Sequence, residues 1–131
     1  MRGSEMISKE KGRVERVKAM IDELLKRIER LEYHQKLLIQ LVDHAEITFT
    51  KLIIQKNLGP LEVEEFHRLC EYLNNKMQEQ KAEGFLYFHP LLKEFTEKLN
   101  KKLEVKETII GCLNENLHVD LMEELSKYLD D

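Results

Sequence analysis

The sequence predicts an all-α protein, with a long N-terminal coiled-coil helix followed by a small multihelical domain of about four shorter helices. Apolar residues recur in heptad register from Val14 to Leu52 and at helical three- and four-residue spacing after Pro60. No segment shows the alternation expected of a strand. Charged residues make up 35% of the 131 residues and there are only two prolines, a composition typical of well-solvated helices.

The long helix carries a narrow apolar seam. Placing Val14 at heptad position a puts apolar residues on nearly every a and d site, and Gln35 is the polar exception. The seam consists of Val14, Val17, Ile21, Leu24, Ile28, Leu31, Leu38, Val42, Ala45, Phe49 and Leu52. Because a narrow stripe needs a facing helix, we expect the chain to bind itself through its first six members, Val14, Val17, Ile21, Leu24, Ile28 and Leu31.

The charges beside the seam favour a parallel dimer. In a parallel pair Arg27 at position g faces Glu32 at position e of the other chain, and an antiparallel pair loses this attraction. Gln35 in the seam and the apolar flanks Met20 and Leu25 leave a trimer open.

We expect the helix to span residues 11–56, after a stretch of residues 1–10 that is flexible or left over from cloning. From Leu37 the apolar surface widens, because Leu37, Ile39, Leu41 and Ile47 join the seam. This part of the helix should therefore pack under the later helices. The β-branched run 47–50 is a weak point at which the helix could kink or break.

Residues 57–131 are expected to form a helical domain packed on the end of the long helix. Asn57, Gly59 and Pro60 are typical of a helix end, an N-cap and a first helical position, so a tight turn is predicted. The next helix should end at Gly84. The apolar connector 85–88 is expected to lie in the core.

Three further helices follow in this interpretation. They start at Pro90, span about 105–114 and span 119–129, and Asn116 ends the second of them. Gly111 should allow a neighbouring element to approach closely. Cys70 and Cys112 fall on apolar faces without a CxxC pattern, which favours buried, reduced thiols.

Three stretches together resemble one family: RIERLEY at 27–33, QKAEGF at 80–85 and LNKKLEVKETI at 99–109. The chain resembles the YhaI-like family of uncharacterised, all-helical cytoplasmic proteins from Bacillus and its relatives. The resemblance runs from about Arg27 to the C-terminus. It implies a multihelical oligomer of unknown function and supplies no functional residues.

Catalytic chemistry has little support in the sequence, and we expect no catalytic, cofactor or metal site. Glu64 to His67 and Glu115 to His118 each match Glu-x-x-His, the spacing used by ferritin-like metal centres. The second pair, however, straddles the predicted turn at Asn116. A metal-dependent enzyme of ferritin-like type is therefore the weakest alternative. Apolar faces on every helix also argue against an obvious small-molecule cavity.

A nucleic-acid-associated regulator is the stronger alternative, because the last two helices are short and closely joined, like a helix-turn-helix. The final helix is acidic, however, and would repel a duplex. Its residues Asp120, Glu123, Glu124 and Tyr128 form a candidate surface for a basic protein partner. The sequence has no signal peptide and no apolar run long enough to span a membrane, which favours the cytoplasm. Together with the seam and the lack of catalytic motifs, it predicts a non-enzymatic homo-oligomer that acts as an adaptor or regulatory interaction module.

Overall fold

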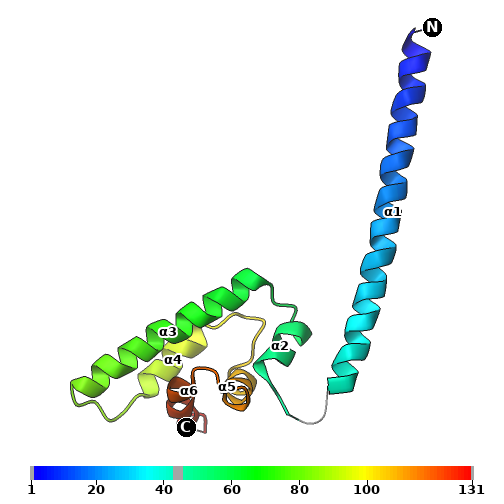
Figure 1. Cartoon of the computed structure of the whole chain (residues 1–131). Helices are drawn as coiled ribbons and strands as arrows, with labels where there is room; N and C mark the ends of the chain where they lie inside the picture. The colour runs from blue at the N-terminus through cyan, green and yellow to red at the C-terminus, as the bar shows by residue number, and fades with distance from the viewer. Residues whose placement is uncertain (1, 43–45, 131) are drawn as a thin grey trace. The chain divides into compact units, whose positions relative to one another are not determined.

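A computed structural model of the chain describes residues 2–42 and 46–130 (Figure 1). Within these ranges every regular element is a helix, so the all-α prediction is confirmed. The chain divides into two units, Met1–His44 and Ala45–Asp131. The helices are α1 (Arg2–Val42), α2 (Phe49–Gln55), α3 (Pro60–Ala82), α4 (His89–Lys98), α5 (Val105–Asn114) and α6 (Val119–Ser126).

The first unit is the single helix α1, and it begins earlier than the sequence predicted. The helix starts at Arg2, nine residues before the predicted start at residue 11. Glu5 lies in the first turn, where a negative charge favours the helix dipole. Ile7 stands seven residues before Val14 and extends the apolar seam by one heptad.

The long helix also ends earlier than predicted, at Val42 instead of residue 56. Thr48 adopts an extended backbone and caps α2, because its side-chain hydroxyl accepts a hydrogen bond from the Lys51 amide at 3.2 Å. The break between α1 and α2 thus adjoins the β-branched run 47–50, where the sequence predicted a possible kink or break. Consequently residues 46–56 belong to the second unit, whereas the apolar pattern predicted them as part of the long helix. The predicted seam position of Ala45 lies outside the described residues.

The second unit has one hydrophobic core that α2 to α6 all supply. Among the described residues of the second unit this core begins at Phe49. The expectation that the widened face around Leu37 packs under the later helices stays a prediction. Leu37 and Leu41 are exposed. The fully buried large side chains are Phe49, Leu73, Met77, Leu91, Phe95, Ile109, Leu121, Met122 and Leu125.

Two predicted turns are confirmed by backbone conformation. Asn57 and Asn116 have φ values of 57° and 59°, in the left-handed region that ends helices. Glu62 ties the first turn to the loop before α5, because its carboxylate accepts hydrogen bonds from Asn100 at 2.7 Å, Lys102 at 3.1 Å and the Gly59 amide at 3.2 Å. These bonds, the one from Asn100 foremost, hold the pKa of Glu62 below its ordinary value.

Gly111 allows α2 to approach α5 closely, as the sequence predicted. A Cβ atom at Gly111 would lie 3.0 Å from the Phe49 amide nitrogen and 3.0 Å from the Thr48 carbonyl carbon. The same contact is reinforced by a hydrogen bond from the Thr50 amide to the Glu115 carboxylate at 2.7 Å. Helix α5 therefore anchors the start of α2.

The connector between α3 and α4 differs from its prediction. Phe88 is buried, but Phe85, Leu86 and Tyr87 are 49%, 92% and 61% exposed. Gly84, at φ 94°, turns the chain away from the end of α3, so only the last residue of the run reaches the core. The apolar run 85–88 predicted that this connector reaches the core, but it did not show which of the four residues would be buried.

Cys70 and Cys112 are free and fully buried, in agreement with the prediction of buried thiols. Burial raises the pKa of both, to about 12 for Cys112. Because the thiolate is the reactive form, neither cysteine is suited to act as a nucleophile or metal ligand at neutral pH.

Candidate functional site

The first candidate surface is the apolar seam of α1. Its six predicted interface residues are all accessible, at exposures between 48% for Ile28 and 66% for Leu31. Among the described residues of its unit, 2–42, α1 is the only element, so nothing in this range covers them. The seam residues are Val14, Val17, Ile21, Leu24, Ile28 and Leu31.

Exposure of this seam is energetically costly. Full burial of one large aliphatic side chain stabilises a protein by about 1.5–3 kcal/mol, so six on one stripe provide a substantial driving force for helix pairing. The polar side of α1 is solvated, and its Arg27–Glu23 ion pair at 3.8 Å is well exposed. A pair of that kind adds little stability of its own. The arrangement suits association along one face.

The second candidate surface, on and after α6, is smaller than the sequence indicated. Asp120 and Glu123 are exposed. Glu124, however, is only 7% exposed, and its carboxylate pairs with Lys127 at 2.6 Å. The prediction that Glu124 belongs to the exposed acidic surface is therefore wrong. Tyr128 is half-buried, and its hydroxyl accepts a hydrogen bond from the Phe88 amide at 3.1 Å. Tyr128 thus serves partly to anchor the connector before α4.

A contact between two histidines is the main feature that the sequence reasoning missed. Nδ1 of His67, on α3, lies 2.8 Å from Nε2 of His118, which precedes α6. The ring of Phe66 lies edge-on to both imidazoles. Burial lowers the pKa of His118 below its ordinary value, and the nearby charge of His67 lowers it further.

The carboxylates of the two Glu-x-x-His segments do not join this pair. Glu115 accepts a hydrogen bond from the Thr50 amide, and Glu64 lies 3.7 Å from Arg68. In the part of the chain that the structure describes, no group of three or more histidine, cysteine or acidic side chains is arranged to hold a metal ion. The two sequence segments therefore meet through their histidines alone. The Glu-x-x-His spacing drew attention to both segments, but as a possible metal site and not as a contact between two histidines.

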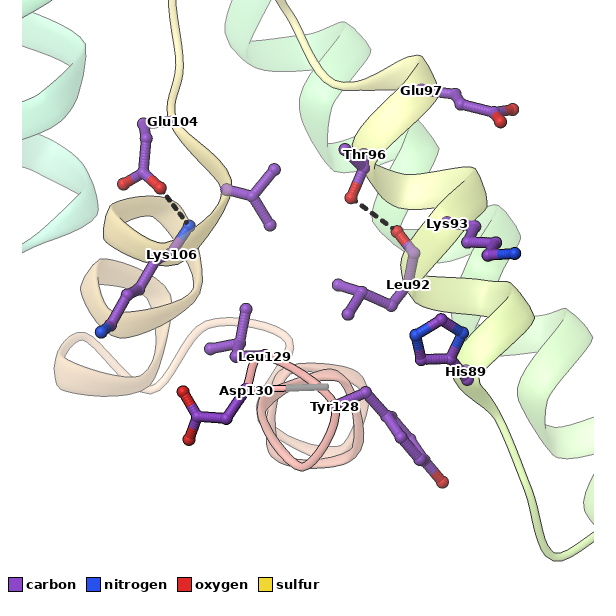
Figure 2. Close-up of a pocket in the computed structure, with 11 residues that line it drawn as sticks. His89, Leu92, Lys93, Thr96, Glu97, Glu104, Lys106, Tyr128, Leu129 and Asp130 are labelled. Carbon is purple, nitrogen blue, oxygen red and sulfur yellow. Dashed lines mark hydrogen bonds between the residues drawn. The ribbon is translucent and has the colours of Figure 1, made fainter.

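A groove of about 670 Å³ lies between α4, the start of α5 and the residues after α6 (Figure 2). This contrasts with the expectation of no obvious cavity. Leu92 and Leu129 point into the groove, while Glu97 and Lys93 extend outward from α4 (Figure 2). Three separate segments form it, within residues 89–97, 104–106 and 128–130, so no single local pattern could have predicted it.

An aromatic cluster borders the groove beside the exposed connector. The ring of Tyr87 stacks on His89 with centroids 5.9 Å apart and meets Tyr128 edge-on at 5.4 Å. His89 and Tyr128 also line the groove. Leu86, next to the cluster, is nearly fully exposed. Exposed apolar groups of this kind are frequent at protein interaction sites.

None of the described helices combines the length and apolar character needed to cross a membrane. Residues 21–130 match a family model whose description reads "Protein of unknown function (DUF1878)". The match begins within the seam of α1 and extends over the whole described part of the second unit. It confirms the expectation of an uncharacterised family, and the narrower resemblance to YhaI-like proteins stays a prediction.

Proposed function

The chain belongs to the DUF1878 family of proteins of unknown function. We propose that the protein acts as a non-enzymatic homo-oligomeric adaptor or regulatory interaction module in the cytoplasm. It associates with its own copies through α1 and presents the second unit to a protein partner.

The observation that supports this proposal most strongly is the exposed seam of α1. An isolated helix gains little stability from its own hydrogen bonds in water, so a helix of 41 residues is expected to depend on packing. The core of the second unit is formed by its own helices, α2 to α6. A second copy of α1 provides a matching heptad stripe.

Parallel pairing is the arrangement that suits the charges. Arg27 and Glu32 would attract each other between chains, and Ile21 and Ile28 at position a with Leu24 at position d favour two strands. A trimer would use the additional apolar flanks of the seam. The mass of the assembly distinguishes the two.

The partner surface of this proposal is the exposed part of α6. Asp120 and Glu123 give it negative charge, and the half-buried Leu117 and Leu129 add apolar area nearby. A basic protein surface would complement this combination, whereas the phosphates of a nucleic acid would be repelled.

Light scattering on the purified protein tests the association. Wild type should show two or three times the chain mass of 15.6 kDa. The double substitution Ile21→Asp with Ile28→Asp should shift the mass toward the monomer, because each buried charge costs several kcal/mol.

A matched control places two aspartates on the opposite side of the same helix, at Ala19 and Tyr33, both at position f. This variant should retain the wild-type mass. A wild type that is monomeric at micromolar concentration, or a control that dissociates as readily as the seam variant, would refute the proposal.

A further inference from the structure

The contact between His67 and His118 depends on protonation. With the two ring nitrogens 2.8 Å apart, one must donate a hydrogen and the other must accept it through a lone pair. A fully protonated imidazole has no lone pair to offer. The contact therefore exists only while at least one of the two rings is neutral, and histidine loses that state within the physiological pH range.

The charged groups around the pair offer limited compensation for a second proton. Glu71, on α3, is the carboxylate whose charge favours the protonated form of His118, but Glu71 itself is exposed. On the same helix, Glu64 is paired with Arg68. Screening by water weakens the help from an exposed carboxylate.

The remaining elements packed around the pair contribute an aromatic ring, polar groups that already have partners, and one exposed carboxylate. From α2 the Phe49 ring lies edge-on to His67 at 6.0 Å, and the Lys51 amine donates a hydrogen bond to the Glu46 carbonyl. At the end of α5, Glu115 binds the Thr50 amide. Asp120 lies in the first turn of α6 and is exposed.

The backbone at His118 links the pair to the position of α6. His118 has a φ of 48°, in the left-handed region that non-glycine residues adopt at a cost, and its carbonyl accepts the first hydrogen bond of the helix from Met122. The imidazole of the same residue makes the contact with α3. Beyond α6, Tyr128 and Leu129 line the groove.

We propose that the His67–His118 contact is a proton-sensitive latch, which holds the beginning of α6 on α3 at neutral pH and is broken when both rings are protonated. Release loosens the docking of α6. It thereby also loosens the residues that follow α6 and form one wall of the groove.

The direction of the pH effect follows from the depressed pKa of His118. The unfolded chain takes up its proton near pH 6.5, before the folded chain does. The stabilising contribution is thus complete above pH 6.5 and is lost as the pH falls from there to the lower pKa of the folded state. Within that window the unfolding equilibrium constant rises by up to about tenfold per pH unit.

Urea unfolding of the full chain at pH 7.5 and pH 5.5, at one protein concentration, tests the latch. The variants are His118→Asn and His67→Gln, and asparagine is chosen because it tolerates the left-handed backbone. Wild type should lose stability on acidification by several-fold more in its unfolding constant than either variant. His34→Gln, on α1, should behave like wild type.

Nuclear magnetic resonance titration of the imidazole protons gives a second measurement that does not depend on unfolding. His118 should titrate below pH 6.5 in wild type, and its midpoint should move upward in His67→Gln. Equal acid sensitivity in wild type and both variants would overturn the proposal. So would independent titration of the two rings near pH 6.5, or a change in the pair's signals on adding EDTA, which would place a metal between them.

Discussion

Helix α1 and the second unit use apolar side chains of the same kinds in opposite ways. Ile21 and Leu24 on α1 are 49% and 53% exposed, whereas Leu73 and Ile109 in the second unit are fully buried. Both regions show regular helical spacing in the sequence. The spacing thus identifies the apolar face of each helix, and the tertiary structure shows that the second unit buries such faces in its own core.

The difference also separates the two kinds of stability in the molecule. The second unit closes its core with α2 to α6, so its unfolding should not depend on protein concentration. If α1 pairs through its seam as proposed, its order should depend on association and therefore on concentration. Matched substitutions in the two regions test this comparison.

The largest expected effect comes from removing the same side chain in each region. Leu73→Ala leaves a cavity in the core and should lower the free energy of unfolding of the second unit by about 2–5 kcal/mol. Leu24→Ala should change that free energy by less than about 0.5 kcal/mol but weaken association. Urea unfolding and light scattering on both variants measure the two effects. Similar losses of unfolding free energy in the two variants would contradict the division into independent regions.

A glycine in each region gives the next test. Gly111→Ala places a Cβ atom 3.0 Å from backbone atoms of α2 that cannot rotate away. This overpacking should cost about 1–3 kcal/mol and outweigh the helix propensity gained. Gly12→Ala meets nothing within 4 Å and should stabilise α1 by about 1 kcal/mol. Thermal melts followed by circular dichroism should move in opposite directions, and a stabilised Gly111→Ala variant would show that α2 and α5 are not in close contact.

The smallest expected effect concerns acid sensitivity. The depressed pKa of Glu62 means that its contribution to stability is present above pH 4.5 and is lost as the pH falls toward the folded value. Glu62→Gln should therefore show a smaller drop in urea midpoint between pH 6 and pH 3 than wild type. Glu23→Gln removes the exposed pair on α1 and should leave the drop unchanged. An unaltered drop in Glu62→Gln would show that the bonds from Asn100 and Lys102 are not maintained in solution.

Local signals predicted much of the fold. Asn57, Gly59 and Pro60 located the turn before α3, because each residue type favours its position through its own backbone preference. Asn116 located the end of α5 in the same way, and Gly111 identified the close approach of a neighbour. These predictions succeeded because they depend on a few adjacent residues.

The errors arose where the outcome depends on distant residues. Thr48 caps a separate helix α2 where a continuous long helix was predicted. The extended segment before it is bound by Asn114 of α5, whose side-chain amide donates a hydrogen bond to the Ile47 carbonyl at 2.7 Å. In the connector, residues 85–87 are exposed and Phe88 alone is buried in the core. Periodicity carries no information about which distant group supplies the next contact.

The sequence by itself determined the helical class, the seam of α1, the main turns and the burial of both cysteines, since backbone preferences and apolar spacing act over a few residues. The tertiary structure alone decided that α2 separates from α1, that Glu124 is buried, and that His67 and His118 meet across 51 positions of the chain. Those outcomes depend on how the helices of the second unit fill one shared volume. Packing in that volume is collective, so no single segment encodes it.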